Sequence, residues 1–355
     1  MASAETVTGA GRRRPVIDQQ QQRIEAFLQS RHPDARITRY AAINGGYSRL
    51  MAEFDAVLDS EKRHLVWRGD PPADRQIIVT SRHNEYALLS ALSNLPGDLA
   101  GAPLYFDRDG SELGTTSMIL NYVDGDQLMT LLKQTDEAFW PELMDATCAL
   151  AAAIHRTDLD ALPVEIERPR SWSDYLDSAI DQWRQLEREQ VEPAPLLRYV
   201  TTWLDQNRPP EAPLSLVHGD FQSPNVLIEP ASKCARAIDW EFAHIGDPRE
   251  DLGYFLALAG LSPPDPTRGD PAELCRAYLG QSHLGEELIN PLAVAYFSIL
   301  PFGPMIRRLS AQIADLVAGR NRSLQTANLT VMVTAMVEGW VTLIGTLHNT
   351  AGATP

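Results

Sequence analysis

The chain has 355 residues, which is enough for two domains or for one large fold with two lobes. Hydrophobic residues make up 44% of it and charged residues 22%, as in an ordinary globular protein. The formal net charge of -16 argues against a nucleic-acid partner, because phosphate backbones are bound by clustered Lys and Arg.

Features that would direct the chain to a membrane or out of the cell are not expected. The three cysteines are far apart and odd in number, so a reducing cytoplasm is the predicted compartment. Residues 1–15 have no apolar core after their charges and do not form a secretory signal. The apolar run from Val331 to Leu347 is interrupted by Glu338 and indicates a buried amphipathic helix rather than a membrane span.

Residues 16–123 are predicted to form a small lobe rich in strands, after a disordered N-terminus at residues 1–15. Asp18 can cap a first helix, which ends near Pro33. The apolar residues on one face of this helix are Ile24, Phe27 and Leu28. The other predicted elements are strands at Arg36–Ile43, Leu50–Leu58, His64–Arg68 and Thr116–Val123, and a helix at Glu85–Leu95.

Residues 124–355 are predicted to form a larger, mainly helical lobe. Its predicted helices lie at Glu142–His155, at Trp172–Glu189, through Trp203, and from Leu252 to the end. Its predicted strands lie at Leu214–Val217, Val226–Ile228 and Ala235–Ile238. The fold class is therefore α+β, and a two-lobed chain of this kind is expected to bind its ligand between the lobes.

One short segment, LVHGDFQSPNVLI, carries residue types that phosphoryl transfer needs. That reaction requires a carboxylate that accepts the proton of the attacking hydroxyl, and oxygen ligands that hold Mg2+ on the nucleotide phosphates. Asp220 and Asn225 have the D-x-x-x-x-N spacing of the protein-kinase catalytic loop. A hairpin after Asn225 would return Asp239 to the same end, as a second metal ligand. A lone His-Gly-Asp is common in turns, but the whole combination favours a catalytic site.

This part of the sequence resembles the aminoglycoside phosphotransferase family of kinase-like enzymes, which also includes choline, macrolide and homoserine kinases. The matching segments are HGDFQSPNVLI, IDWEFAHIGDPREDLGYF and the upstream GGYSRL. The sequences of these segments are most similar to those of the subgroup that occurs fused to acyl-CoA dehydrogenases. The resemblance implies a bilobal protein-kinase-like fold, in which residues 16–123 bind the nucleotide and residues 124–355 carry out catalysis and bind the substrate.

Carried over to this chain, the resemblance implies that Asp220 is the catalytic base and that Asn225 and Asp239 bind Mg2+. His218, Asp247 and Asp251 are expected to support the loop rather than to act chemically, with Asp247 and Asp251 bonded to loop backbone and capping the following helix. Glu241, just past the metal aspartate, is equally compatible with a solvated position and with the rim of the substrate site.

The nucleotide is predicted to lie against three parts of the first lobe. Gly45, Gly46 and Ser48 form a turn where a kinase places its phosphate-covering loop, although a Gly-Gly pair is also an ordinary hairpin turn. Arg68, at the end of a strand, is expected to contact the α- and β-phosphates and to pair with Glu85, where the family usually has Lys. By the family's pattern, the backbone of Asn121 and Val123 bonds to adenine, and Leu120 lies behind the base. Such backbone contacts do not distinguish ATP from GTP.

The leading prediction is an ATP-dependent kinase of a small hydroxylated molecule, acting as a monomer or homodimer. The alternative is a nucleotide-binding pseudokinase, which the missing strand lysine favours. A cationic aminoglycoside or choline would call for a carboxylate cluster, and the candidates are Asp124, Asp126, Glu241 and Glu250. The subgroup resemblance favours a hydroxyacyl-CoA or another hydroxylated metabolite. Aromatic residues of the second lobe either line an apolar pocket or, more typically of helix-spaced aromatics, form core; they are Trp172, Tyr175, Trp183 and Trp203.

Overall fold

The structure is a computed structural model that describes residues 14–43, 49–71, 80–190, 192–261, 263–268, 270–319 and 324–351. The chain divides into two compact units, the first formed by residues 1–86 and 101–122 and the second by residues 87–100 and 123–355. The division differs from the predicted lobes at residues 87–100. This segment belongs with the second unit because Leu99 O accepts a hydrogen bond from Ala237 N–H at 2.9 Å and Asp98 pairs with Arg236 at 2.6 Å.

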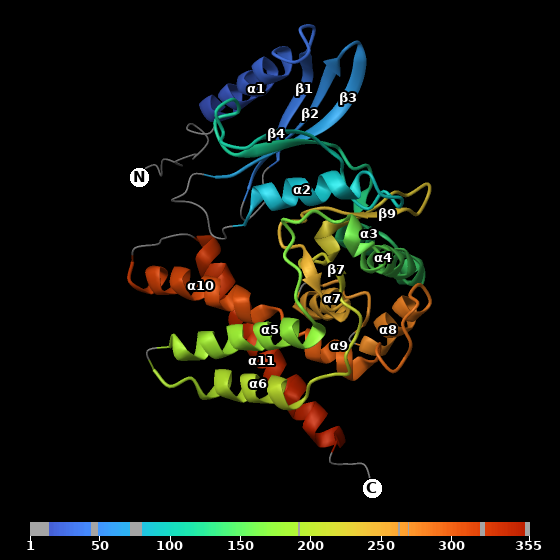
Figure 1. Ribbon diagram of the computed structural model, residues 1–355, viewed down its shortest axis with the longest axis vertical. Coiled ribbons are helices and arrows are strands. Elements are labelled where there is room, and N and C mark those ends of the chain that lie inside the picture. The colour runs from blue at the N-terminus through green and yellow to red at the C-terminus, as the bar shows by residue number, and fades with distance from the viewer. Residues whose placement is uncertain are drawn as a thin grey trace, which may run out of the picture. The chain divides into compact units, whose positions relative to one another are not determined.

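The first unit is built on an antiparallel sheet of five strands in the order β1-β2-β3-β5-β4 (Figure 1). The strands are β1 (Arg36–Ile43), β2 (Leu50–Leu58), β3 (Glu61–Gly69), β4 (Pro103–Asp107) and β5 (Ser117–Asn121). The predicted bounds of β1 and β2 are confirmed, because their alternating residues fit a sheet with one buried face. The edge strand β4 was not predicted. It begins at Pro103 and pairs irregularly with β5, which is typical of an edge.

Helix α1 (Arg14–Gln29) packs its apolar face on this sheet. Ile24, Phe27 and Leu28 are buried there as predicted, in one core with strand residues such as Phe54. The predicted start of the helix is wrong, since α1 begins at Arg14 and Asp18 lies inside it rather than at its cap. Proline is tolerated in a first helical turn, so Pro15 does not delay the start of the helix. The predicted disordered N-terminus, residues 1–15, is wrong at Arg14 and Pro15, which begin α1, and its residues 1–13 lie outside the described residues.

The second unit is mainly helical and holds two small sheets (Figure 1). Its helices are α3 (Leu128–Gln134), α4 (Trp140–His155), α5 (Trp172–Arg188), α6 (Pro195–Gln206), α7 (Arg249–Leu261), α8 (Pro271–Leu279), α9 (Pro291–Phe297), α10 (Phe302–Val317) and α11 (Leu324–Ala351). Its strands are β6 (Asp126–Gln127), β7 (Ser215–Val217), β8 (Val226–Ile228), β9 (Ala235–Ala237) and β10 (His244–Gly246). Helix α2 (Arg82–Leu92) runs across the division between the units. Among the described residues, no helix combines the length and the apolar character that crossing a membrane requires.

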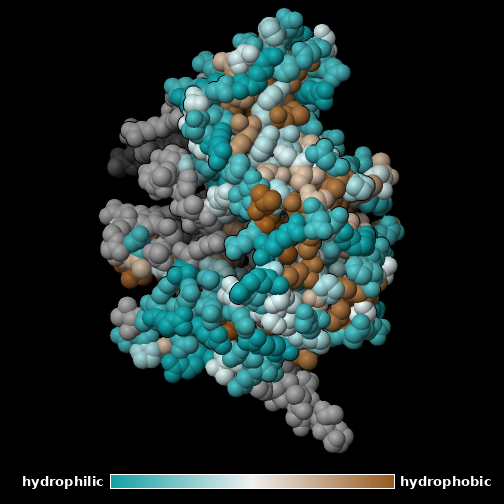
Figure 2. Space-filling model, in the orientation of Figure 1, coloured by the Kyte–Doolittle hydropathy of each residue, from teal (hydrophilic) through white to brown (hydrophobic). Residues whose placement is uncertain are grey.

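Aromatic side chains form the core of the second unit. Trp172, Tyr175, Trp183 and Trp203 are all buried in one cluster, and Trp183 Nε1 donates to Leu300 O at 2.9 Å. They are therefore core residues and not the lining of an apolar pocket. The opposite faces of α5 and α6 are exposed and polar, which agrees with the hydrophilic surface over these helices in Figure 2.

Candidate active site

The loop between β7 and β8 carries Asp220 and Asn225. Strand β7 is fully buried and pairs antiparallel with β10. The loop closes through a short 3-10 turn at Ser223–Asn225, where Asn225 N–H donates to Gln222 O at 2.8 Å. Pro224 is the second residue of this turn, where the fixed φ of proline is compatible with a helical conformation. Because β8 follows at once, both ends of the loop are anchored in buried strands.

Gly219 is required at its position for two independent reasons. Its φ is +78°, in the left-handed region that L side chains rarely adopt. A Cβ atom added here would also lie 2.4 Å from Phe242 O. The segment after Asp239 therefore packs directly against the backbone of the loop, and no side chain fits between them.

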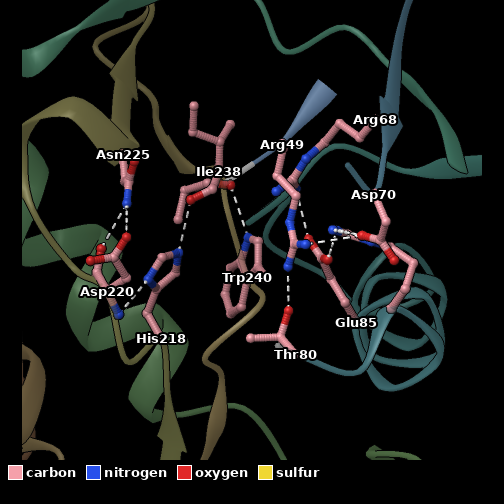
Figure 3. Close-up of polar contacts among 12 residues, drawn as sticks. Arg49, Arg68, Asp70, Thr80, Glu85, His218, Asp220, Asn225, Ile238 and Trp240 are labelled. Atoms are coloured by element: carbon pink, nitrogen blue, oxygen red, sulfur yellow. Dashed lines mark hydrogen bonds and ion pairs between the residues drawn. The ribbon is translucent and has the colours of Figure 1, made fainter. Parts of the chain in front are cut away.

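Asp220 is held by several donors in a buried setting. Its Oδ1 accepts from Gln222 Nε2 at 2.8 Å. Its Oδ2 accepts from Asn225 Nδ2 at 2.7 Å (Figure 3). Burial raises the pKa of this carboxyl to about 7, and the negative charge of Asp239 adds to that rise. The hydrogen bonds from Tyr254 and Asn225 act in the opposite direction. A carboxyl group with a pKa near neutrality is suited to accept a proton.

The ring of His218 connects the loop to the hairpin that follows. Its Nε2 lies 3.0 Å from Ile238 O, and its Nδ1 lies 3.3 Å from Asp220 N (Figure 3). A carbonyl only accepts and an amide N–H only donates, so these contacts fit a ring with a proton on Nε2 and a lone pair on Nδ1. Both ring nitrogens are thus bonded to backbone, which makes His218 a structural support of the loop.

The β8–β9 hairpin brings Asp239 to the end of the sheet where Asn225 lies. Val226 pairs with Ala237, and Ile238 N–H donates to Asn225 O at 2.9 Å. Asp239 has a φ of +69°, an uncommon conformation for a residue other than glycine. Strained backbone of this kind occurs preferentially at functional sites. The predicted hairpin is present, and it brings Asp220, Asn225 and Asp239 into one small region.

Asp251, on α7, fastens the loop from the other side. Its Oδ2 accepts from His218 N–H at 2.9 Å and its Oδ1 accepts from Gly219 N–H at 3.0 Å. His155 Nε2 donates to Oδ2 at 3.1 Å. Burial alone would raise the pKa of this carboxyl, but the hydrogen bond from His155 and nearby positive charge leave that pKa below its ordinary value. A buried, ionised Asp251 therefore fixes two consecutive loop amides.

Asp247 forms a fully buried ion pair with Arg249. Its Oδ1 accepts from Arg249 N–H at 2.9 Å, which caps the start of α7, and its Oδ2 accepts from Trp172 Nε1 at 2.6 Å. The guanidinium also donates to Pro210 O at 2.7 Å. Removing one partner of such a pair typically destabilises a protein by about 3–5 kcal/mol. Asp247 thus joins α5, α7 and the segment before β7.

Glu250 is buried rather than presented to a ligand. Its Oε2 accepts from Tyr175 Oη and from His244 Nε2, the latter at 3.2 Å. His244 Nδ1 also donates to Phe242 O at 2.9 Å, so both ring nitrogens are donors. Partial burial lowers the pKa of His244, but Glu250 and Phe242 outweigh it and raise this pKa to about 9. Glu250 therefore neutralises the imidazolium of His244. It is no longer a candidate carboxylate for binding a cationic substrate.

Tyr254 is a site residue that sequence reasoning missed. Its hydroxyl is hydrogen-bonded to the Asp220 carboxylate, and its ring stacks on Phe302 with centroids 5.0 Å apart. The available signal was helical spacing. Tyr254 follows Asp251 by three residues on α7, so both side chains lie on the face of the helix that meets the loop.

In the first unit, Arg68 and Glu85 form the expected ion pair. Arg68 Nη1 lies 2.7 Å from Glu85 Oε1, and both side chains are buried. Sequence reasoning missed the other members of this cluster. Arg82 pairs with both Glu85 and Asp70. Asp70 also pairs with Arg49 (Figure 3). Two signals were available: Arg82 precedes Glu85 by one helical turn, and Arg49 follows the Gly-Gly turn directly.

The remaining predicted residues are placed as follows. Gly45, Gly46 and Ser48 lie outside the described residues. Asn121 ends β5 in the first unit with Leu120 buried before it, and Val123 begins the second segment of the second unit. Asp124 is exposed and Glu241 is half-buried. The roles predicted for these residues stay predictions.

Comparison with known proteins assigns the class. Residues 56–286 match the phosphotransferase enzyme family, which is more than half of the chain. The chain belongs to this family and has its kinase-like fold. It is accordingly a phosphotransferase that acts on a small molecule.

Among curated proteins, the chain is similar to acyl-CoA dehydrogenase family member 10 of Mus musculus, with 26% identity over 203 residues. This match covers 54% of the chain and 18% of that protein, so the chain spans only about a fifth of the length of this relative.

Among solved structures, it is similar to a candidate aminoglycoside phosphotransferase from Ralstonia eutropha, with a TM-score of 0.66, 19% identity, and coverage of 91% of this chain and 98% of that one. It is also similar to a thermostable mutant of an aminoglycoside phosphotransferase in complex with ADP and hygromycin B, with a TM-score of 0.58, 18% identity, and coverage of 89% and 98%. At these identities the likeness shows the fold.

Proposed function

We propose that this protein transfers the γ-phosphate of ATP to a hydroxyl group of a small molecule, with Asp220 as the base. The observation that carries the proposal is the convergence of Asp220, Asn225 and Asp239 on one loop and the hairpin after it. Both carboxylate oxygens of Asp220 accept hydrogen bonds, and burial raises the pKa of this carboxyl to about 7. It would orient the acceptor hydroxyl and take its proton, a contribution typically worth about 10²–10⁴-fold in rate.

Asn225 and Asp239 fit the part of Mg2+ ligands. Asn225 uses its Nδ2 for both of its bonds to Asp220, at 2.9 Å to the backbone oxygen and 2.7 Å to Oδ2, so its Oδ1 is oriented away from Asp220. Asp239 adds a carboxylate, and hard oxygen donors of this kind suit Mg2+. Within the described residues no group of three or more His, Cys, Asp or Glu is placed to hold a metal ion. A small number of protein ligands is usual for Mg2+ in kinases. There the ion is held by one or two protein side chains together with substrate phosphates and water. When bound, the ion would neutralise charge on the transferred phosphoryl group.

The same residues separate this proposal from its alternative, a pseudokinase that binds nucleotide without turnover. The residues proposed as base and as metal ligands are in place, and Arg68 pairs with Glu85. Arg in place of Lys preserves the positive charge and offers a planar fork of donors to phosphate oxygens. Nothing in the described site removes a group that the reaction needs.

For the acceptor, we propose a hydroxyacyl-CoA or a related hydroxylated metabolite over an aminoglycoside. Glu250, a candidate carboxylate for a cationic substrate, is neutralised by His244 inside the fold. The similarity to an acyl-CoA dehydrogenase family member supports an acyl substrate, although it involves a fifth of that protein. Because the chain is also similar to an enzyme solved with hygromycin B, aminoglycosides are included among the compounds to be assayed.

The test is a coupled measurement of ADP release with Mg2+ and ATP, over a panel of hydroxyacyl-CoAs, choline and aminoglycosides. We expect turnover with a hydroxyacyl-CoA, and we expect Asp220→Asn to lose at least about 10²-fold in kcat while its ATP affinity is retained. Binding of ATP without turnover on the full panel would favour the pseudokinase. Turnover by Asp220→Asn at the rate of the wild type would remove Asp220 from the role of base.

A further inference from the structure

Gln222 is a polar side chain in the loop between β7 and β8 to which the proposed reaction assigns no role. It follows Asp220 by two residues and is half-buried. Its backbone carbonyl closes the 3-10 turn, since it accepts from Asn225 N–H at 2.8 Å. Its side chain turns back and donates from Nε2 to Asp220 Oδ1, also at 2.8 Å. The turn thus fixes Gln222 at a point from which its amide reaches the proposed base.

The orientation of the Gln222 amide follows from this contact. A base is ionised before it takes a proton, and an ionised carboxylate only accepts hydrogen bonds. The group that lies 2.8 Å from Asp220 Oδ1 is therefore the NH2 group of Gln222 and not its oxygen. Hydrogen bonds to an ionised group are about twice as strong as those between neutral groups, so this contact is a firm hold on Oδ1.

Three protein donors surround the Asp220 carboxylate. Gln222 holds Oδ1, Asn225 holds Oδ2, and the hydroxyl of Tyr254 is the third donor. An ionised carboxylate has about four acceptor positions, so one position is left for the hydroxyl of the substrate. Because both oxygens are bonded, the group cannot turn about its Cβ–Cγ bond without breaking a hydrogen bond. The carboxylate therefore has one orientation.

A substrate hydroxyl and a water molecule place different demands on such a base. A bound substrate offers its hydroxyl from one fixed direction, so the carboxylate has to present an acceptor position along that line. Water is small and rotates, so it can approach any accessible position of the carboxylate. A base held in one orientation thus favours transfer to the bound molecule over hydrolysis of ATP by water.

We propose that Gln222 is a positioning residue that holds Oδ1 of Asp220, so that the base serves the substrate hydroxyl in preference to water. The inference rests on the proposed function and adds to it a residue that controls the choice of acceptor. In both reactions the attacking O–H bond breaks and its proton passes to Asp220. The oxygen then bonds to the γ-phosphorus as the bond from that phosphorus to ADP breaks, and ADP leaves. Gln222 supplies orientation only.

The experiment measures two rates in the presence of Mg2+ and ATP. One is phosphorylation of β-hydroxybutyryl-CoA, replaced by choline or an aminoglycoside if that compound is not turned over, and the other is phosphate release without an acceptor. Gln222→Met keeps the length of the side chain and removes its donor. We expect the transfer rate to fall about ten- to hundredfold, the usual effect of losing one hydrogen bond to a charged group. Hydrolysis should fall by a smaller factor, so the ratio of hydrolysis to transfer should rise.

This ratio separates positioning from a structural role, because a variant that is partly unfolded loses both rates by the same factor. Gln127→Met is the matched control. Gln127, on β6, donates from Nε2 to Pro224 O at 3.0 Å, so the change removes an amide hydrogen bond to the same loop without touching Asp220. Its ratio should equal that of the wild type.

Gln222→Asn provides a second measurement if Gln222→Met does not fold. Asn keeps the polar amide but is one methylene shorter, so its NH2 group does not reach Oδ1, and the ratio should rise as in Gln222→Met. Equal losses of the two rates, an unchanged transfer rate, or the same rise in ratio for Gln127→Met would overturn the inference and leave the proposed function standing. Absence of transfer by the wild type to every compound of the panel would overturn both.

Discussion

Replacing Asp251 by Asn tests whether one carboxylate on α7 holds the catalytic loop. The side chain is fully buried and accepts three hydrogen bonds, from His218 N–H, Gly219 N–H and His155 Nε2. Asn has the same shape but only one oxygen. In its less costly orientation the new NH2 group faces Gly219 N–H, so a charge-assisted bond of about 1.5–3 kcal/mol is lost and a buried donor is left unsatisfied at about 1–3 kcal/mol. The remaining two bonds also lose the charge of the acceptor. We therefore expect a loss of about 3–5 kcal/mol in the free energy of unfolding.

Thermal unfolding measures this loss. For a unit of this size 1 kcal/mol corresponds to about 2–4 °C, so Tm should fall by on the order of 10 °C. Asp205→Asn is the control, because Asp205 makes only surface ion pairs with Arg184 and Arg208, and such pairs contribute less than about 1 kcal/mol. If Asp251→Asn lowered Tm no more than Asp205→Asn, the clamp would be energetically unimportant and the reasoning would be wrong.

Three further changes probe the same region. Gly219→Ala places a Cβ on a residue in the left-handed conformation, which costs a strain of about 1–3 kcal/mol. We expect kcat to fall at least tenfold while the affinity for ATP is retained. A folded variant with the kcat of the wild type would contradict the close packing described for this glycine. His244 has a folded pKa of about 9 against an ordinary value of 6.5, so its stabilisation is full below about pH 6.5 and is lost as pH rises through about 9. His244→Gln should therefore flatten the fall of Tm over that alkaline range, and two parallel curves would show that the ion pair with Glu250 does not contribute. Tyr254→Phe keeps the ring and removes the hydroxyl bonded to Asp220, and it should lower kcat about tenfold without changing the KM for ATP; an unchanged kcat would mean that the hydroxyl does not orient the base.

Local pattern was enough to predict the elements that surround the site. The Gly45-Gly46 turn signal separates the two predicted strands β1 and β2, and the bounds of both strands agree with the prediction. The β8–β9 hairpin follows from two short apolar runs around a polar turn, and that hairpin is what returns Asp239 to Asn225. The helix that contains Glu85 was predicted to start at Glu85 but begins at Arg82, because one polar turn precedes its apolar face.

Partners far apart in the sequence could not be predicted. Asp251 meets His155 across 96 residues, and Asp247 meets Trp172 across 75. Neither pairing leaves a periodic trace, since only the folded chain brings them together. The contact of Glu250 with Tyr175 likewise joins residues 75 positions apart, so the sequence alone leaves Glu250 among the candidates for binding a cation.

The clamp on α7 also has a kinetic consequence. Asp251 ties the amides of His218 and Gly219 to a helix that buries Leu252 and Phe255 in the second unit. These two loop amides cannot open to solvent unless the helix or its core moves. Their hydrogen exchange should therefore be as slow as that of core amides in β7, and far slower than is usual for a loop. A loop held in this way is assembled when the unit folds, and it needs no separate activation step to become ordered.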